Sequence, residues 1–116
     1  MRELALELVA RAVSVGGVRC DEKLDLYCGP DLIGSIVSTG NAAMVEIHAH
    51  PDDARVLIEE CPGCSPSGDS ARAALGWVSF VFASGADPYL LSFFVESVRS
   101  ALDRLEAARE AGRPDP

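Results

Sequence analysis

Hydrophobic residues recur along this chain with helical spacing in three segments. Between residues 2 and 14, leucine, valine and alanine return every three or four positions and form one helix face. A similar stripe predicts a second helix that starts at Pro51, and a third, the longest, over residues 88–110. Asp87 and Pro88 are the residue types that begin such a helix, as N-cap and first helical residue.

Strand patterns occupy most of the chain between these helices. Residues 22–28 and 42–50 alternate, and residues 32–38 are rich in β-branched residues. A tight reversal at residues 39–41 predicts that the last two of these segments form a hairpin. The nearly continuous apolar run over residues 75–84 is typical of a strand covered on both faces.

The order of predicted elements is therefore α-β-β-β-α-β-α. Hairpin strands beside helices predict an α+β fold, a two-layer sandwich with helices on one face of a mainly antiparallel sheet. Proline and glycine predict a loop over residues 61–70, and Gly16 or Gly17 ends the first helix. A chain of 116 residues fits one domain, which we expect over residues 1–110, with a flexible tail over residues 111–116.

Composition narrows the classes of partner and the location. The formal net charge is −8, which disfavours binding to nucleic acid or to an anionic membrane surface. No apolar run approaches the roughly 20 residues of a membrane span, and Glu3 and Glu7 are wrong for a secretory signal, so we expect a cytoplasmic protein. The chain has no Gln, one Asn and one Lys. This depletion favours either a thermophilic source or a GC-rich genome.

The stretch IHAHPDDA, residues 47–54, carries the only two histidines of the chain. In a strand, His48 and His50 point to the same face. Two imidazoles so placed could chelate one ion such as zinc, with an oxygen from Glu46 or Asp53. The alternative is a solvent-facing sheet surface whose imidazoles hold no metal.

The four cysteines leave three interpretations open. Cys61 and Cys64 have the CxxC spacing of a redox pair or of half a zinc site. They follow a predicted helix instead of opening one, so no helix N-terminus stabilises a thiolate. Cys20 and Cys28 have seven residues between them, which is not a second zinc knuckle. Reduced thiols, one or two structural disulfides, and a metal or redox site all stay open; a hyperthermophilic source would favour disulfides.

Two aromatic residues on the last predicted helix are candidates for a contact with another subunit. Phe93 falls beside the polar side of this helix, away from the main apolar stripe, and Tyr89 lies near it. Exposed aromatic residues often mark contact surfaces. The alternative is a wide stripe that packs under the first helix. Together with the common preference for twofold homo-oligomers, the pair predicts a homodimer.

Two runs resemble a known layout: GSIVSTGNAAMVEIHAHPDDARVLIEE and GWVSFVFASGADPYLLSFFVESVRSAL. Their hairpin, the helix HPDDARVLIEE, the Gly76-Trp77-Val78 strand and the long closing helix are similar to those of the YjbR/CyaY-like small domains and the related luciferase-like domain of uncharacterised proteins. The resemblance covers about two-thirds of the chain. It implies an α+β sandwich, mostly without an assigned activity. Some members are suspected of binding nucleic acid, from which the charge of −8 departs. It assigns no functional residues.

The sequence contains no glycine-rich phosphate loop after a strand and no nucleophile elbow. We therefore predict a non-enzymatic domain that acts through protein–protein contacts as a homodimer. The alternative is a metal-binding or thiol redox protein that uses His48, His50, Cys61 and Cys64.

Overall fold

The computed structural model describes residues 2–39, 42–83, 85 and 87–112. These residues form four helices and six strands: α1 (Arg2–Val13), β1 (Arg19–Cys20), β2 (Asp25–Cys28), β3 (Asp31–Thr39), β4 (Ala42–His48), α2 (Pro51–Glu60), β5 (Cys64–Pro66), α3 (Ser70–Ala74), β6 (Trp77–Phe82) and α4 (Pro88–Ala111). The predicted order is present, with β1, β5 and α3 added to it.

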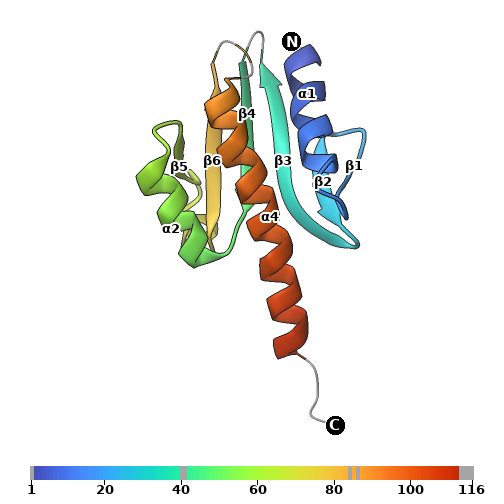
Figure 1. Ribbon diagram of the computed structural model, residues 1–116, viewed down its shortest axis with the longest axis vertical. Coiled ribbons are helices and arrows are strands. Elements are labelled where there is room, and N and C mark those ends of the chain that lie inside the picture. The colour runs from blue at the N-terminus through green and yellow to red at the C-terminus, as the bar shows by residue number, and fades with distance from the viewer. Residues whose placement is uncertain (1, 40–41, 84, 86, 113–116) are drawn as a thin grey trace.

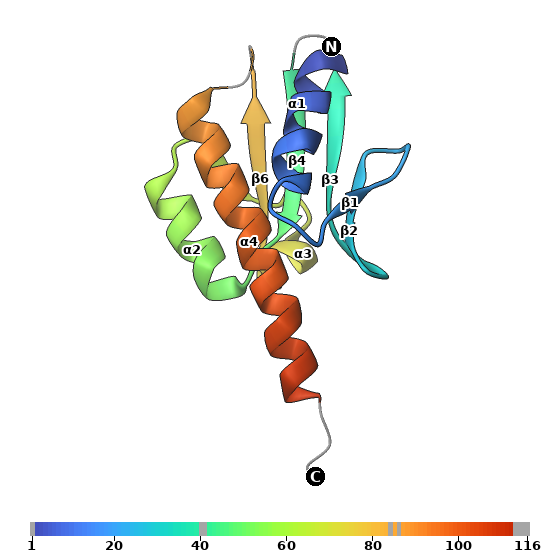
Figure 2. The same ribbon diagram turned by 45° about the vertical axis from the view of Figure 1, so that its right-hand side comes forward.

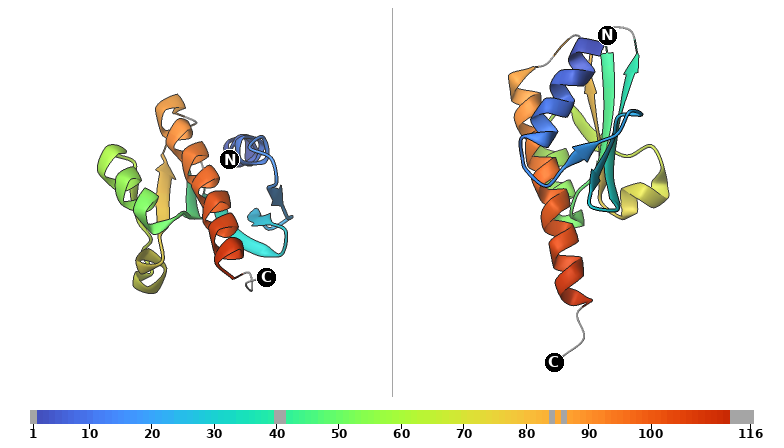
Figure 3. Two further views of the ribbon diagram at one scale, coloured as in Figure 1. Left: turned by 60° about the horizontal axis from the view of Figure 1, so that its bottom comes forward. Right: turned by 90° about the vertical axis from the view of Figure 1, so that its right-hand side faces the viewer.

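The six strands form one antiparallel sheet in the order β1-β2-β3-β4-β6-β5 (Figure 1). The long helices α1, α2 and α4 cover one face of this sheet (Figure 2), and the short helix α3 lies on the other (Figure 3). The predicted α+β sandwich is confirmed, and α3 is the one described helix outside the predicted helical layer.

The core lies between the sheet and the three long helices. Alternate residues of the two central strands point into it and are fully buried, among them Val45 and Ile47 on β4. Phe94 of α4 packs edge-on against Phe80 and Phe82 of β6, with ring centroids 6.2 and 6.3 Å apart. The apolar run of β6 is therefore the partner surface of α4, and α4 extends past the end of the sheet (Figure 1).

The loop predicted over residues 61–70 is wrong in part. Residues Cys64–Pro66 pair with β6 as an edge strand, where a proline is tolerated because its missing N–H faces no neighbour. Asp69 caps α3 by accepting hydrogen bonds from two backbone N–H groups of its first turn.

The predicted ends of α1 and α4 agree with the structure, and two other predicted segments lie outside the described residues. Gly16 and Gly17 adopt positive φ after α1, and Asp87 with Pro88 begins α4. Residues 40–41 of the predicted reversal lie outside the described residues, as do residues 113–116 of the predicted tail. No helix within the described ranges has the length and apolar character needed to cross a membrane.

Candidate functional site

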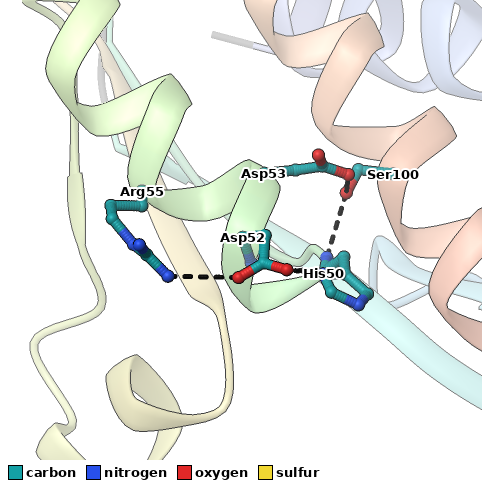
Figure 4. Close-up of polar contacts among 5 residues, drawn as sticks. All are labelled: His50, Asp52, Asp53, Arg55 and Ser100. Atoms are coloured by element: carbon teal, nitrogen blue, oxygen red, sulfur yellow. Dashed lines mark hydrogen bonds and ion pairs between the residues drawn. The ribbon is translucent and has the colours of Figure 1, made fainter.

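The corner between β4 and α2 is built by IHAHPDDA. His50 is the N-cap of α2: its backbone is extended, and its Nδ1 accepts a hydrogen bond from the Asp52 N–H at 3.2 Å. Pro51 occupies the first helical position, as predicted. The Asp52 carboxylate in turn pairs with the Arg55 guanidinium at 3.1 Å (Figure 4). A histidine cap was not foreseen, because Ser, Thr, Asp and Asn are the usual caps.

Ser100 joins this corner to α4. Its Oγ accepts a hydrogen bond from the His50 backbone N–H at 2.9 Å and donates one to Asp53 Oδ2 at 2.6 Å (Figure 4). Beyond the other end of α2, Gly63 lies against the side chain of Leu90, near the start of α4. The two helices therefore run side by side in opposite directions.

A groove of about 400 Å³ lies between these helices, and we name it the α2–α4 groove. Its walls are facing stripes of residues spaced three or four positions apart on each helix. Val56, Leu57 and Phe93 supply apolar surface, and Val56 is 49% exposed. The polar part of the lining has one serine, one guanidinium and four carboxylates: Ser100, Arg99, Asp53, Glu60, Glu96 and Asp103.

The aromatic pair predicted from the sequence lies at this groove. Phe93 lines it, and Tyr89 sits one turn earlier on α4 with 59% of its surface exposed. The two rings meet edge to face, with centroids 5.1 Å apart. The structure thus brings the two rings together, with Tyr89 exposed and Phe93 half-buried, and their contact with another subunit stays a prediction.

A second surface, the open sheet face, is the side of β3, β4 and β6 that faces away from the long helices. Val37, Met44 and Val81 stand in one row there, because Met44 pairs with Val37 on one side and with Val81 on the other. They are 54%, 50% and 49% exposed. Three neighbouring strands therefore present an apolar row to solvent.

Below this row, α3 folds onto the same face. The Glu46 carboxylate accepts hydrogen bonds from Ser67 Oγ at 2.9 Å and from Arg72 Nη1 at 3.3 Å. The Arg72 guanidinium lies 4.3 Å from the centre of the Trp77 ring, and His48 stacks on Trp77 with centroids 4.9 Å apart. Trp77 is buried by these polar groups on the open sheet face, outside the main core.

The His48 imidazole is hydrogen-bonded to the backbone at Leu75. Its Nε2 lies 3.0 Å from the Leu75 carbonyl oxygen, and because a carbonyl only accepts, Nε2 carries the proton. Burial and, to a lesser extent, the nearby Arg104 and Arg72 guanidinium groups lower the pKa of His48. The two histidines have separate local roles, since His48 covers Trp77 and His50 caps α2.

All four cysteines are free thiols. Cys61 and Cys64 are both buried and lie on one turn, in which the Cys64 N–H donates to the Cys61 carbonyl at 3.0 Å. Burial, with a smaller contribution from Cys61, raises the pKa of Cys64 to about 12. An attacking cysteine needs a low pKa, so this shift disfavours Cys64 as a nucleophile. Cys20 and Cys28 are half-buried on β1 and β2.

The metal site predicted from His48, His50, Cys61 and Cys64 does not assemble as one cluster. Among the described residues, no three His, Cys, Asp or Glu side chains gather closely enough to hold a metal ion. The cysteine pair lies together between α2 and β5, and each imidazole has its own partner elsewhere.

Comparison with known proteins gives no match: no protein-family model fits the sequence, and no curated protein or solved structure is significantly similar to the chain. The resemblance to the YjbR/CyaY-like and luciferase-like domains therefore stays a prediction.

Proposed function

We propose that this chain is a non-enzymatic domain that acts through protein–protein contacts and forms a homodimer through the open sheet face. The observation that carries this proposal is the exposed row of Val37, Met44 and Val81. Contiguous exposed apolar surface is typical of contact sites. This row lies on three strands that are hydrogen-bonded side by side, so the sheet holds its side chains in register.

The charge of this face is compatible with a second copy of the chain as its occupant. Each copy has a formal net charge of −8, so two copies repel, and a contact through uncharged surface keeps this repulsion smallest. On the open sheet face the single carboxylate among the residues paired across β3, β4 and β6 is Glu46, which the Arg72 guanidinium neutralises. The rest of these outward residues are neutral: Ser35, Val37, Ala42, Met44, His48, Trp77, Ser79 and Val81.

The row is also complementary to itself. A twofold axis that runs along β4 past Met44 sets Val37 of one copy opposite Val81 of the other. Such an isologous contact closes after two copies, which matches the commonest oligomer.

Sedimentation equilibrium tests the proposal. We expect the wild-type chain to have about twice the 12.3 kDa mass of one copy, and Met44→Glu to sediment as a monomer. Val13→Glu is the matched control: it places the same charge on an exposed apolar residue of α1, far from the row, and leaves the dimer intact. Circular dichroism confirms that each variant is folded. A monomeric wild type, or an equal effect of both variants, would refute the homodimer.

The alternative metal-binding or thiol redox function has less support. A reactive Cys64 would have to ionise against the burial that raises its pKa, and His48 and His50 are engaged with different partners. Stoichiometric zinc in the purified chain would favour this alternative. A cytoplasmic location is part of our proposal, supported by four cysteines held as free thiols, the state that a reducing compartment maintains.

A further inference from the structure

We propose that the α2–α4 groove binds a basic amphipathic helix of a partner protein. This inference rests on the proposed role in protein–protein contacts and not on the homodimer, which uses the opposite face. The groove combines an apolar floor, a rim that is mostly carboxylate, and a length set by two helices side by side. These features indicate, in turn, the apolar side chains, the positive charge and the helical conformation of the partner.

The apolar part of the groove is partly open to solvent, although Leu57 is buried and Phe93 half-buried. Val56 shows about half of its surface at the middle of α2, and Phe93 stands opposite on α4. Tyr89 extends this apolar surface by one turn along α4. A partner that places leucine-sized side chains here removes apolar surface on both molecules from water.

The rim selects positive charge. Four carboxylates face one guanidinium, and Arg99 is already paired with Glu96 at 3.2 Å. Within the described part of the chain, Glu60 and Asp103 have no ion pair. They lie toward opposite ends of the groove, so lysine or arginine side chains flanking an apolar stripe would meet a carboxylate at each end.

Glu60 does not help the fold. It lies in the last turn of α2, where the helix dipole is negative and a carboxylate is unfavourable, and this turn has no basic residue. A cation from outside would relieve this repulsion.

The geometry favours a helix over an extended peptide. Both walls are helices, whose backbone groups are satisfied internally, so no strand edge in the groove can pair with an extended backbone. α2 has 10 residues and is about 15 Å long, which matches about three turns of a docked helix. Apolar side chains at positions i, i+3 or i+4, and i+7 of the partner would then face the floor.

Fluorescence anisotropy tests this with a labelled synthetic peptide of about 14 leucine and lysine residues, patterned as an amphipathic helix. A scrambled peptide of the same composition is the control for bulk charge attraction. We expect the patterned peptide to bind the full chain at physiological ionic strength at least about tenfold more tightly than the scrambled one, because only the former presents one apolar stripe.

Two double variants locate the contact. Glu60→Lys with Asp103→Lys reverses charge inside the groove and should weaken binding at least about tenfold, given two close charge pairs. Glu59→Lys with Glu106→Lys makes the same charge change on the same helices outside the groove lining, and should alter binding less than about threefold. Val56→Ser tests the floor and should also weaken binding.

The results separate this inference from its competitors. Equal binding of patterned and scrambled peptides, or equal effects of the two double variants, would overturn the groove. A second outcome is that the patterned peptide binds no more tightly than the scrambled one, while spermine competes with the peptide and binds the groove variants more weakly. This outcome would reassign the groove to a polyamine and overturn the partner helix. A monomeric chain that still binds the peptide would refute only the homodimer.

Discussion

Gly76 lies between α3 and β6, where its backbone comes very close to the backbone of the β4–α2 corner. Its φ is +102°, and a Cβ there would lie 2.5 Å from the Ala49 carbonyl oxygen and 3.1 Å from Pro51 Cα. Gly76→Ala therefore forces a left-handed conformation on alanine and a clash with backbone. We expect a loss of about 2–4 kcal/mol in the free energy of unfolding, measured by urea denaturation.

Gly68→Ala is the matched control for this substitution. Gly68 does not have a positive φ in the left-handed range, and a Cβ there would meet nothing within 4 Å. We expect Gly68→Ala to change the free energy of unfolding by less than about 1 kcal/mol, in either direction. Equal losses in the two variants would mean that the close approach at Gly76 has no energetic weight.

His48 gives the fold a defined response to acid. Its pKa is lowered in the folded state, chiefly by burial, so between this value and the unfolded value near 6.5 the unfolded chain binds more protons. Stability should therefore fall as the pH drops through about 6.5 to the folded pKa, and this contribution should level off below it.

His48→Gln removes this titration while keeping a side chain able to donate to the Leu75 carbonyl. We expect the variant to lose less stability than wild type between about pH 7 and about pH 5, where a histidine changes charge. Urea denaturation at several pH values measures both slopes. Identical slopes would show that His48 titrates alike in the folded and unfolded states.

The thiols should divide into two classes by reactivity. Cys61 and Cys64 are buried, and burial raises the pKa of Cys64 to about 12. Cys20 and Cys28 are half-buried and more accessible, although burial, with Asp21 and Asp25, also raises the pKa of Cys20. With a chromogenic disulfide reagent at neutral pH, we expect Cys20 and Cys28 to react first and the CxxC pair to react only on unfolding. Rapid labelling of Cys64 in the folded chain, identified by mass spectrometry, would revive the redox interpretation.

At the level of elements, Ser100 fixes the spacing of α2 and α4. Ser100→Ala leaves the His50 N–H without its acceptor and frees Asp53 from its donor. We expect a loss of about 1–3 kcal/mol in the free energy of unfolding, because a backbone donor loses its acceptor at a nearly buried serine. Ser92→Ala, at an exposed serine of the same helix, should cost under about 0.5 kcal/mol; similar losses would contradict this role.

The elements that could be predicted from the sequence are those that bury an apolar surface in the core. Periodicity located α4 and a continuous apolar run located β6, because these two elements pack against each other. β5 and α3 could not be predicted, since the edge strand has only three residues and the helix five. Their stability comes from pairing with β6 and from the contacts of Arg72 with Glu46 and Trp77, which local propensity does not encode.

The part of the candidate site that the sequence predicted is the part that can be judged from one helix alone. Phe93 stood out because it lies off the apolar stripe of its own helix. The rest of the α2–α4 groove depends on which stripes of two helices face each other, and the contact from Ser100 to His50 that sets this spans 50 positions of sequence. The sequence also did not predict that the two imidazoles are separated. They are separated because the strand ends before His50, where the chain turns into α2.

At the scale of the whole molecule, the charge of −8 makes the two proposed surfaces respond oppositely to salt. Dimerisation brings like charges together, and salt screens this repulsion, with a Debye length of about 30 Å at 0.01 M and about 3 Å at 1 M. We expect the dissociation constant of the dimer to fall about three- to tenfold between about 0.02 M and about 0.5 M sodium chloride.

Over the same range the lysine-rich peptide should bind the α2–α4 groove more weakly, because its attraction to the carboxylates is screened. Sedimentation equilibrium and anisotropy follow the two constants in one buffer series. A dimer that weakens with salt would show that ion pairs between the copies hold it. Glu46, the single carboxylate among the residues paired across β3, β4 and β6, already forms an ion pair with Arg72, so this result would place the contact on another surface.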